Sequence, residues 1–274
     1  MEGLVVVICA PSQRGKDFIA TKTMEELSLF DKNSSYASGY KTRKARATDG
    51  KHITCVESKK EIPIKKSNRL KATIYGSQTI VYDKEEIRKK LADGEIVFIA
   101  TGAPKLAKKV KSEFGSQCFS VFVKGQQVNE KTMVKEDLKR HGDLFDLTEE
   151  EKSELIEASK RRVTKRIAAY EAMKPDYEDF IEDEKLGADY IFINLYTLIG
   201  GYWNSEIDEM AKGKFAALTN AILDIHQMIN NNQDWGDRYS LSEDERKNII
   251  DSDSLFTLQD VLLEYLDGKH SWGM

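Results

Sequence analysis

The stretch that most constrains the fold is residues 5–17, which read Val-Val-Val-Ile-Cys-Ala-Pro-Ser-Gln-Arg-Gly-Lys-Asp. The four branched apolar residues are typical of a strand buried on both faces, and a short polar loop then ends in Gly-Lys before a helix-compatible run. Strand, loop, lysine and helix in this order are the layout of a phosphate-binding loop. Loop amides and the positive end of the helix dipole would bind an anion, while Lys16 neutralises the outer phosphates.

The usual form of this loop is G-x-x-x-x-G-K-[ST], and the match is incomplete. Ala10 stands for the first glycine and Asp17 for the hydroxyl residue, so an ordinary strand-to-helix connection is the alternative interpretation. Asp17 either ligates Mg²⁺ or is only an acid favoured by the helix dipole. Arg14 either points to solvent or adds charge to the phosphates. The predicted nucleotide site consists of Ser12, Gln13, Arg14, Gly15, Lys16 and Asp17.

The rest of the chain predicts an α/β fold. Further continuous apolar runs at 96–100, 118–123 and 190–194 read as buried strands, and helical stretches separate them. Strands alternating with helices predict a three-layer, doubly wound fold with a mainly parallel sheet, in which ligands bind at the carboxyl ends of the strands. The opening loop follows the first strand and therefore lies at that edge.

Beyond Asn194 the pattern changes to helices. Apolar residues recur at helical spacing over 205–229, and shorter helices are expected at 242–250 and 257–266. We therefore predict a P-loop domain over 1–195 and an acidic helical extension over 196–274. The apolar stripe of 205–229 either packs on the core or joins two subunits, which would make a homodimer through the C-terminal helices.

Composition limits the class of protein. Residues are 40% hydrophobic and 32% charged, and no apolar run approaches the ~20 residues that span a membrane, so we expect no membrane partner. The three cysteines lack C-x-x-C spacing, which fits reduced thiols in a cytoplasmic protein. The net charge of -4 combines 19 Lys and Arg against 8 Asp and Glu over 41–111 with 6 against 14 over 196–274. The basic segment indicates an anionic partner.

Several short motifs occur in an order that resembles the guanylate kinase-like branch of the P-loop kinases over about residues 3 to 195. Ala10–Lys16 is similar to that family's G-P-S-G-x-G-K, and Ile193-Asn194 to the V-x-N that ends its last core strand. Thr42–Arg46 resembles the T-R-x-x-R acceptor-phosphate motif, and Tyr75-Gly76 resembles the Y-Y-G acceptor motif. Lys165–Glu171 is similar to the helix that follows the lid.

The resemblance implies an ATP-dependent, Mg²⁺-requiring phosphotransferase. Arg43 and Arg46 would clamp the acceptor phosphate, as paired guanidinium groups can, or they line a solvated basic turn. Tyr75 would donate its hydroxyl to the same phosphate, or it fills the sheet face. Arg162 and Arg166, four residues apart on one helix, would act with Lys16 on the transferred phosphoryl group, or they form ion pairs with neighbours such as Glu157.

Some positions depart from guanylate kinases. Lys66 stands near the guanine-reading glutamate, Ile53 takes the place of a tyrosine, and Ala100 and Gly102 replace the D-x-D after the second buried strand. Gly15-Lys16-Asp17, Lys51-His52-Ile53 and Thr101-Gly102-Ala103 are instead similar to segments of the bacterial ribose bisphosphate phosphokinases. This branch implies that the small-molecule acceptor is a phosphate on a sugar or a nucleotide. In our interpretation of the residues, His52 is structural.

Two other functions stay open. A catalytically degenerate guanylate kinase-like binding module is supported by Ala10, Gln13, Ala100 and Gly102. A kinase acting on a polynucleotide is supported by the basic segment, although no run of exposed aromatic residues for base stacking is evident. Binding that weakens steeply with salt would favour the polynucleotide.

Overall fold

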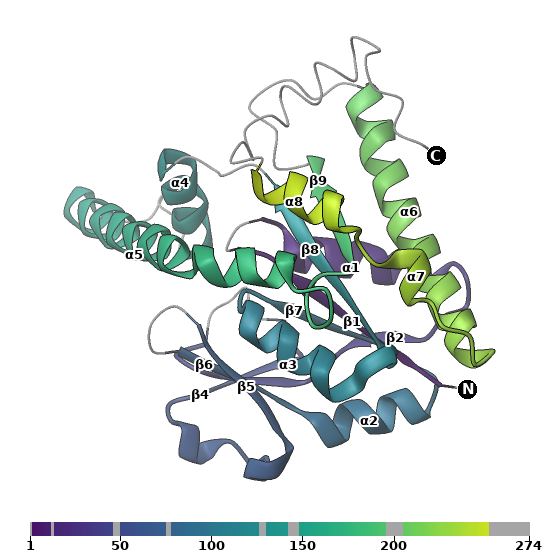
Figure 1. The fold of residues 1–274 in the computed structure, drawn as a ribbon. Helices are drawn as coiled ribbons and strands as arrows, with labels where there is room; N and C mark the ends of the chain where they lie inside the picture. The colour runs from purple at the N-terminus through teal and green to yellow at the C-terminus, as the bar shows by residue number, and fades with distance from the viewer. Residues whose placement is uncertain are drawn as a thin grey trace.

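A parallel five-stranded sheet, sheet A, forms the centre of the molecule in the computed structural model (Figure 1). The structure describes residues 2–11, 14–45, 50–74, 78–125, 130–141, 148–195 and 205–251, except for the side chains of a few helical residues, among them Arg166. The strand order of sheet A is β2 (Ser34–Tyr36), β7 (Ile96–Thr101), β1 (Leu4–Cys9), β8 (Cys118–Gly125) and β9 (Tyr190–Asn194).

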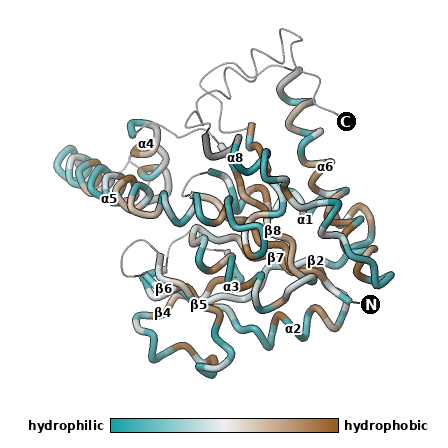
Figure 2. Tube along the Cα trace, viewed as in Figure 1, coloured by the Kyte–Doolittle hydropathy of each residue, from teal (hydrophilic) through white to brown (hydrophobic). Residues whose placement is uncertain are grey.

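Both faces of sheet A are buried, which explains the continuous apolar runs. Alternate residues of β1 contribute to two separate cores: Val5 and Val7 to one face, Val6 and Ile8 to the other. Figure 2 shows the same concentration of hydrophobic residues along the central strands. One face is covered by α2 (Lys84–Ala92), α3 (Pro104–Phe114) and α5 (Glu149–Glu182). The other face is covered by α1 (Lys16–Ser28) and α6 (Ser205–Asn230).

These layers confirm the predicted α/β fold class with a parallel sheet and C-terminal helices. The apolar stripe of α6 packs on the sheet, with Phe215, Leu218 and Ile222 almost completely buried in the same core as β1. Of the two interpretations of this stripe, the structure therefore shows core packing. After α6 the chain forms α7 (Gly236–Tyr239) and α8 (Glu243–Asp251), and α8 packs against α5. The predicted helix at 257–266 lies outside the described residues.

A second, four-stranded sheet, sheet B, extends from the β2 side of the molecule. Its order is β4 (Ile53–Val56), β3 (Gly39–Thr42), β6 (Gln78–Asp83) and β5 (Arg69–Ile74), and only the β3–β4 pair is parallel. Its own small core contains Ile62, Ile64 and Val81. The short 3₁₀ turns are η1 (Lys59–Glu61), η2 (Lys66–Asn68) and η3 (Gly115–Gln117). Sheet B carries most of the basic segment.

Helix α4 (Glu130–His141) packs against the N-terminal part of α5, and this part of α5 projects away from sheet A (Figure 1). Thr148 begins α5 with a capping box to Glu151. Pro175 lies inside α5, and the helix nevertheless continues to Glu182. Its last turns bury Tyr177 and Phe180 against the core, and this packing outweighs the local cost of the proline. Among the described residues no helix is long and apolar enough to cross a membrane.

Candidate phosphate-binding site

The predicted phosphate loop joins the carboxyl end of β1, the middle strand of sheet A, to the first residue of α1. Gly15 precedes the helix with φ 82° and ψ 16°, a left-handed conformation that glycine adopts without strain. The Ala10 amide donates to the Thr101 carbonyl at the end of β7, at 3.1 Å, which ties the loop to the neighbouring strand. Ser12 and Gln13, both predicted site residues, lie outside the described residues.

Asn194, the last residue of β9, holds the loop from the other side. Its side-chain amide donates to the Arg14 carbonyl at 2.9 Å, and the residue is only 1% exposed. A Cβ at Gly15 would lie 2.4 Å from the Asn194 Nδ2 atom, so glycine is needed at position 15 for space as well as for φ. The sequence singled out Asn194 only by its resemblance to a strand-ending motif, and the structure gives it a positioning role.

Lys16 and Asp17 begin α1 and form an ion pair of 2.8 Å, with side chains 20% and 69% exposed. Burial works to raise the pKa of the Asp17 carboxyl, but the positive charges of Lys16, Lys41 and His52 outweigh it, and the net pKa lies below the usual value. Asp17 is therefore ionised at neutral pH. An accessible, ionised carboxylate beside the loop fits Mg²⁺, which uses one or two carboxylates together with phosphate oxygens and water.

Tyr36, the last residue of β2 in sheet A, and His52, directly before β4 of sheet B, lie together beside the start of α1. The Tyr36 hydroxyl donates to the Asp17 carbonyl at 3.0 Å and lies 3.1 Å from the Thr21 hydroxyl oxygen. The Tyr36 ring stacks on the His52 imidazole, with centroids 4.0 Å apart and planes 9° apart. His52 was interpreted from its own residue type as structural, and the only signal for its place beside the loop was the Lys51-His52-Ile53 similarity.

The predicted acceptor residues are only partly described. Arg43 follows β3, where its guanidinium donates to the Lys44 carbonyl at 2.8 Å and to the Cys55 Sγ at 3.7 Å. Arg46 and Tyr75 lie outside the described residues. The structure thus places Arg43 and Lys41 at one end of sheet B, and the clamp formed with Arg46 and Tyr75 remains a prediction.

Arg14 turns inward from the loop. It is 4% exposed, its guanidinium donates to the Gly125 carbonyl at the end of β8, and its Cζ lies 6.0 Å from the centroid of the Tyr170 ring on α5. The solvent-facing alternative is therefore wrong. Burial lowers the pKa of the guanidinium, and the phenol groups of Tyr170 and Tyr177 act in the opposite direction.

Arg162, a predicted lid arginine, is held within the α4–α5 hairpin. Its Nε lies 2.8 Å and its Nη2 2.7 Å from the Asp137 Oδ2, and Ser159 donates to the same carboxylate oxygen at 3.0 Å. Of the two alternatives, the ion pair therefore describes Arg162. Its partner is Asp137 and not the expected Glu157, which pairs with Lys160 at 2.7 Å. The Arg166 side chain is not described.

Two further features bear on ligands. Among the described residues, no group of three or more His, Cys, Asp or Glu could hold a metal ion by itself, so any Mg²⁺ would need ligand phosphates.

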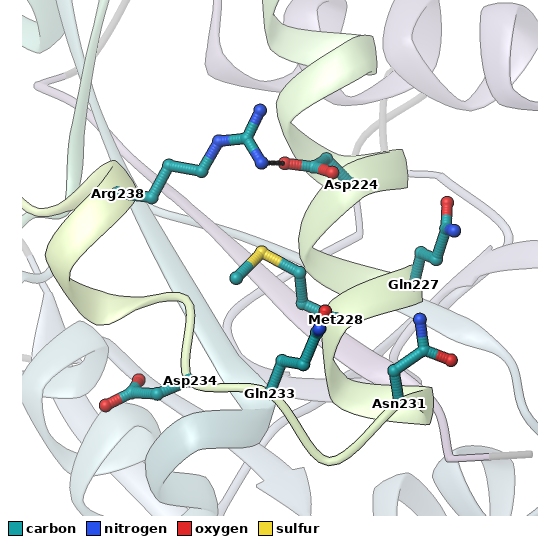
Figure 3. A pocket seen from close by; sticks show the side chains of 7 residues that line it. All are labelled: Asp224, Gln227, Met228, Asn231, Gln233, Asp234 and Arg238. Atoms are coloured by element: carbon teal, nitrogen blue, oxygen red, sulfur yellow. Dashed lines mark ion pairs between the residues drawn. The ribbon is translucent and has the colours of Figure 1, made fainter.

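A separate pocket lies between α6 and α7, where Arg238 pairs with Asp224 at 3.0 Å (Figure 3). The end of α6 contacts Glu2 through Asn230, so this pocket lies near the opposite edge of sheet A from the phosphate loop.

Solved structures similar to this chain include a guanylate kinase. No family model matches the chain, and no curated protein matches it. A solved structure of guanylate kinase from Anaplasma phagocytophilum is similar over 81% of this chain and 86% of that chain, with 14% sequence identity and a TM-score of 0.43.

Proposed function

We propose that this protein is an ATP-dependent kinase that transfers the γ-phosphate of ATP to the phosphate of a nucleotide or sugar phosphate. One observation supports this most: Gly15-Lys16 lies at the carboxyl end of the central parallel strand and opens a 13-residue helix. The backbone amides there face a ligand at the positive end of the helix dipole, and a lysine is placed to neutralise it.

The donor side of the site would use Lys16 and Asp17. Lys16 would exchange its ion pair with Asp17 for the β- and γ-phosphates, while Asp17 would hold Mg²⁺ directly or through water. The predicted contacts of Ser12, Gln13 and the following amides complete the donor cradle. Mg²⁺, when bound, would neutralise charge that develops on the phosphate oxygens.

The acceptor side would be the end of sheet B that faces the loop. Lys41 and His52 add positive charge beside Asp17, and Arg43 comes directly after the strand that bears Lys41, which fits a phosphate-bearing acceptor. An oxygen of the acceptor phosphate would attack the γ-phosphorus as the bond to the β–γ bridging oxygen breaks, and ADP would leave. This chemistry needs positioning and charge neutralisation rather than a strong base.

Arg46 and Tyr75 are proposed to complete the acceptor clamp, and Arg166 to act as a lid arginine. Arg162 would reach the transferred group only by giving up its bonds to the Asp137 carboxylate. The Asp137 carboxylate would then be left buried without its guanidinium partner. This costs free energy unless opening of the hairpin also exposes the carboxylate to water.

A binding module without turnover is the second candidate function. The strand end at β7 carries Ala100, Thr101 and Gly102, and the Thr101 hydroxyl accepts from the Ala103 amide at 3.0 Å. Ala100 and Gly102 stand where the guanylate kinase-like pattern has the two aspartates of D-x-D, so these positions supply no carboxylate. Such a protein would bind ATP or an anionic partner through Lys16 and sheet B without transferring phosphate.

The test is calorimetric titration of ATP with Mg²⁺ into wild type, Lys16→Ala and Lys22→Ala. Lys22 is an exposed lysine of the same helix that pairs with Glu25 at 2.7 Å, so its variant controls for loss of charge on α1. Loss of a charged hydrogen-bond donor costs about 1.5–3 kcal/mol, so Lys16→Ala should weaken binding by roughly 10- to 150-fold and Lys22→Ala by less than about twofold.

Wild-type protein is then offered a panel of nucleoside and sugar monophosphates with radiolabelled ATP. Transfer of label to one member, lost in Lys16→Ala, would establish the kinase and its acceptor. Lys16-dependent ATP binding without transfer to any member would favour the binding module. An oligonucleotide in the panel, tested at low and high salt, covers the polynucleotide alternative.

A further inference from the structure

We propose that Arg14 is a positioning residue that fastens the phosphate loop to α5, so that ligand binding at the loop controls the part of α5 that bears Arg162 and Arg166. The role of these two arginines rests on the proposed function. The link between loop and helix rests on contacts within the protein itself.

The contacts of Arg14 connect three separate segments. Its carbonyl accepts from Asn194 at the end of β9, its guanidinium donates to the Gly125 carbonyl at the end of β8, and the same guanidinium lies over the Tyr170 ring on α5. A movement of the loop backbone at Arg14 therefore acts directly on α5. The next residue in the chain is Gly15, which directly precedes α1.

The surroundings of Arg14 make its positive charge costly to bury. A guanidinium that is 4% exposed loses most of its hydration, and among the described groups the ones that offset this loss are Tyr170 and Tyr177, not a carboxylate. A buried charge without an ionic partner is costly, and a cation–π contact offsets only part of that cost. A negatively charged ligand bound at the loop would stabilise the positive charge of the Arg14 guanidinium.

Tyr170 is a partly buried residue of α5 that packs against the core on one face of sheet A. Seven residues further along the helix, the Tyr177 hydroxyl donates to the Gly102 carbonyl at 2.8 Å and fixes the helix to the end of β7. In the opposite direction α5 projects outward with α4 (Figure 1). The contact between Arg14 and Tyr170 thus lies on α5 between Tyr177, which fixes the helix, and Arg162, which pairs with α4.

Residues 162, 166 and 170 are spaced by four, so they follow one face of α5. At 1.5 Å per residue, Arg166 lies about 6 Å and Arg162 about 12 Å along the axis from Tyr170. A small change in the direction of the helix at Tyr170 therefore displaces both arginines relative to the loop. This displacement of the two arginines by a change in helix direction is the physical basis of the proposed coupling.

The first experiment is hydrogen exchange of the ligand-free protein. Arg14→Met removes the charge and the guanidinium contacts, Tyr170→Leu removes the ring, and Tyr170→Phe keeps the ring. We expect amides of residues 163–173 to exchange at least about tenfold faster in Arg14→Met and Tyr170→Leu than in wild type, and unchanged in Tyr170→Phe. Amides of α6 should be unchanged in all variants, which shows that the fold persists.

The second experiment repeats the exchange with saturating ATP and Mg²⁺ and compares wild type, Arg14→Met and Arg14→Lys. ATP should slow exchange over 163–173 in wild type and have at most half that effect in the two variants, each compared at an ATP concentration that calorimetry of that variant has established as saturating. Arg14→Lys keeps the charge but loses the planar group that lies on the ring, so it separates positioning from charge.

Exchange over 163–173 that is unchanged by Arg14→Met in the ligand-free protein would overturn the proposal. It would also be overturned if Arg14→Met lost ATP binding while this segment exchanged as in wild type, because Arg14 would then act on the phosphates. If wild type itself binds no ATP, the proposed function fails, and the ligand-free comparison alone decides whether Arg14 fastens α5.

Discussion

The contact between Gly15 and Asn194 allows a quantitative test of how the phosphate loop is built. In Gly15→Ala the new Cβ would lie 2.4 Å from the Asn194 Nδ2 atom, so the Asn194 side chain must move and lose its 2.9 Å hydrogen bond to the Arg14 carbonyl. A left-handed conformation costs a residue with a Cβ about 1–2 kcal/mol. Leaving a buried carbonyl unsatisfied costs about 1–3 kcal/mol more.

We therefore expect Gly15→Ala to lower the free energy of unfolding by about 2–5 kcal/mol, the sum of those two contributions. Asn194→Ala alone should cost about 1–3 kcal/mol, since it removes the same hydrogen bond. In the Asn194→Ala background there is no amide to displace, so Gly15→Ala should then cost only the backbone strain of about 1–2 kcal/mol.

The assay is equilibrium urea unfolding of wild type, the two single variants and the double variant, analysed as a double-mutant cycle. A coupling of about 1–3 kcal/mol between the two positions is expected. The reasoning is refuted if Gly15→Ala costs the same amount with and without Asn194, because the loop would then not depend on this close approach.

Three other substitutions test separate parts of the structure. Arg162→Leu should destabilise by about 3–5 kcal/mol because it leaves the fully buried Asp137 carboxylate without its guanidinium, while the neighbouring, exposed Arg161→Leu should change stability by less than about 0.5 kcal/mol. Burial works to raise the pKa of Asp183, but hydrogen bonds from Lys108 and two backbone amides lower it to about 2. This lowered pKa stabilises the fold above the unfolded value of 3.8, and the contribution disappears as pH falls through 2. Because solvent screens this partly exposed carboxylate, urea unfolding of Asp183→Asn should show a loss of about 1 kcal/mol at pH 7 that fades as pH falls below 2. Gly213→Ala, at an exposed position of α6 with nothing within 4 Å of the new Cβ, should raise the melting temperature by stabilising the helix by about 0.5–1 kcal/mol; a lower melting temperature would contradict the open environment.

Much of the fold was predictable because its signals are local. The apolar runs at 5–8, 96–100, 118–123 and 190–194 correspond to the strands β1, β7, β8 and β9. A strand buried on both faces needs no alternation of polar residues, so it appears in the sequence as a continuous run. The helix over 205–229 was equally clear, since apolar spacing specifies a face to be buried. The sequence left open what that face would meet.

The candidate site was predictable where one short segment carries it. Gly15, Lys16 and Asp17 are consecutive, and the strand before them and the helix after them determine their geometry. The burial of Arg14 was not predictable, because an arginine in a polar loop normally faces water. Its partners, Gly125 and Tyr170, are more than 100 residues away along the chain.

By itself, then, the sequence determined the fold class, four strands of sheet A and the segment in which a phosphate loop is predicted, since each depends on side-chain periodicity or on neighbouring residues. Only the tertiary structure decided which side chains meet: Asn194 against Gly15 and Tyr36 with His52 beside Asp17 near the strand ends, and Asp137 with Arg162 within the α4–α5 hairpin. These contacts join residues that are distant in the chain, and burial rather than residue type gives them their chemical character.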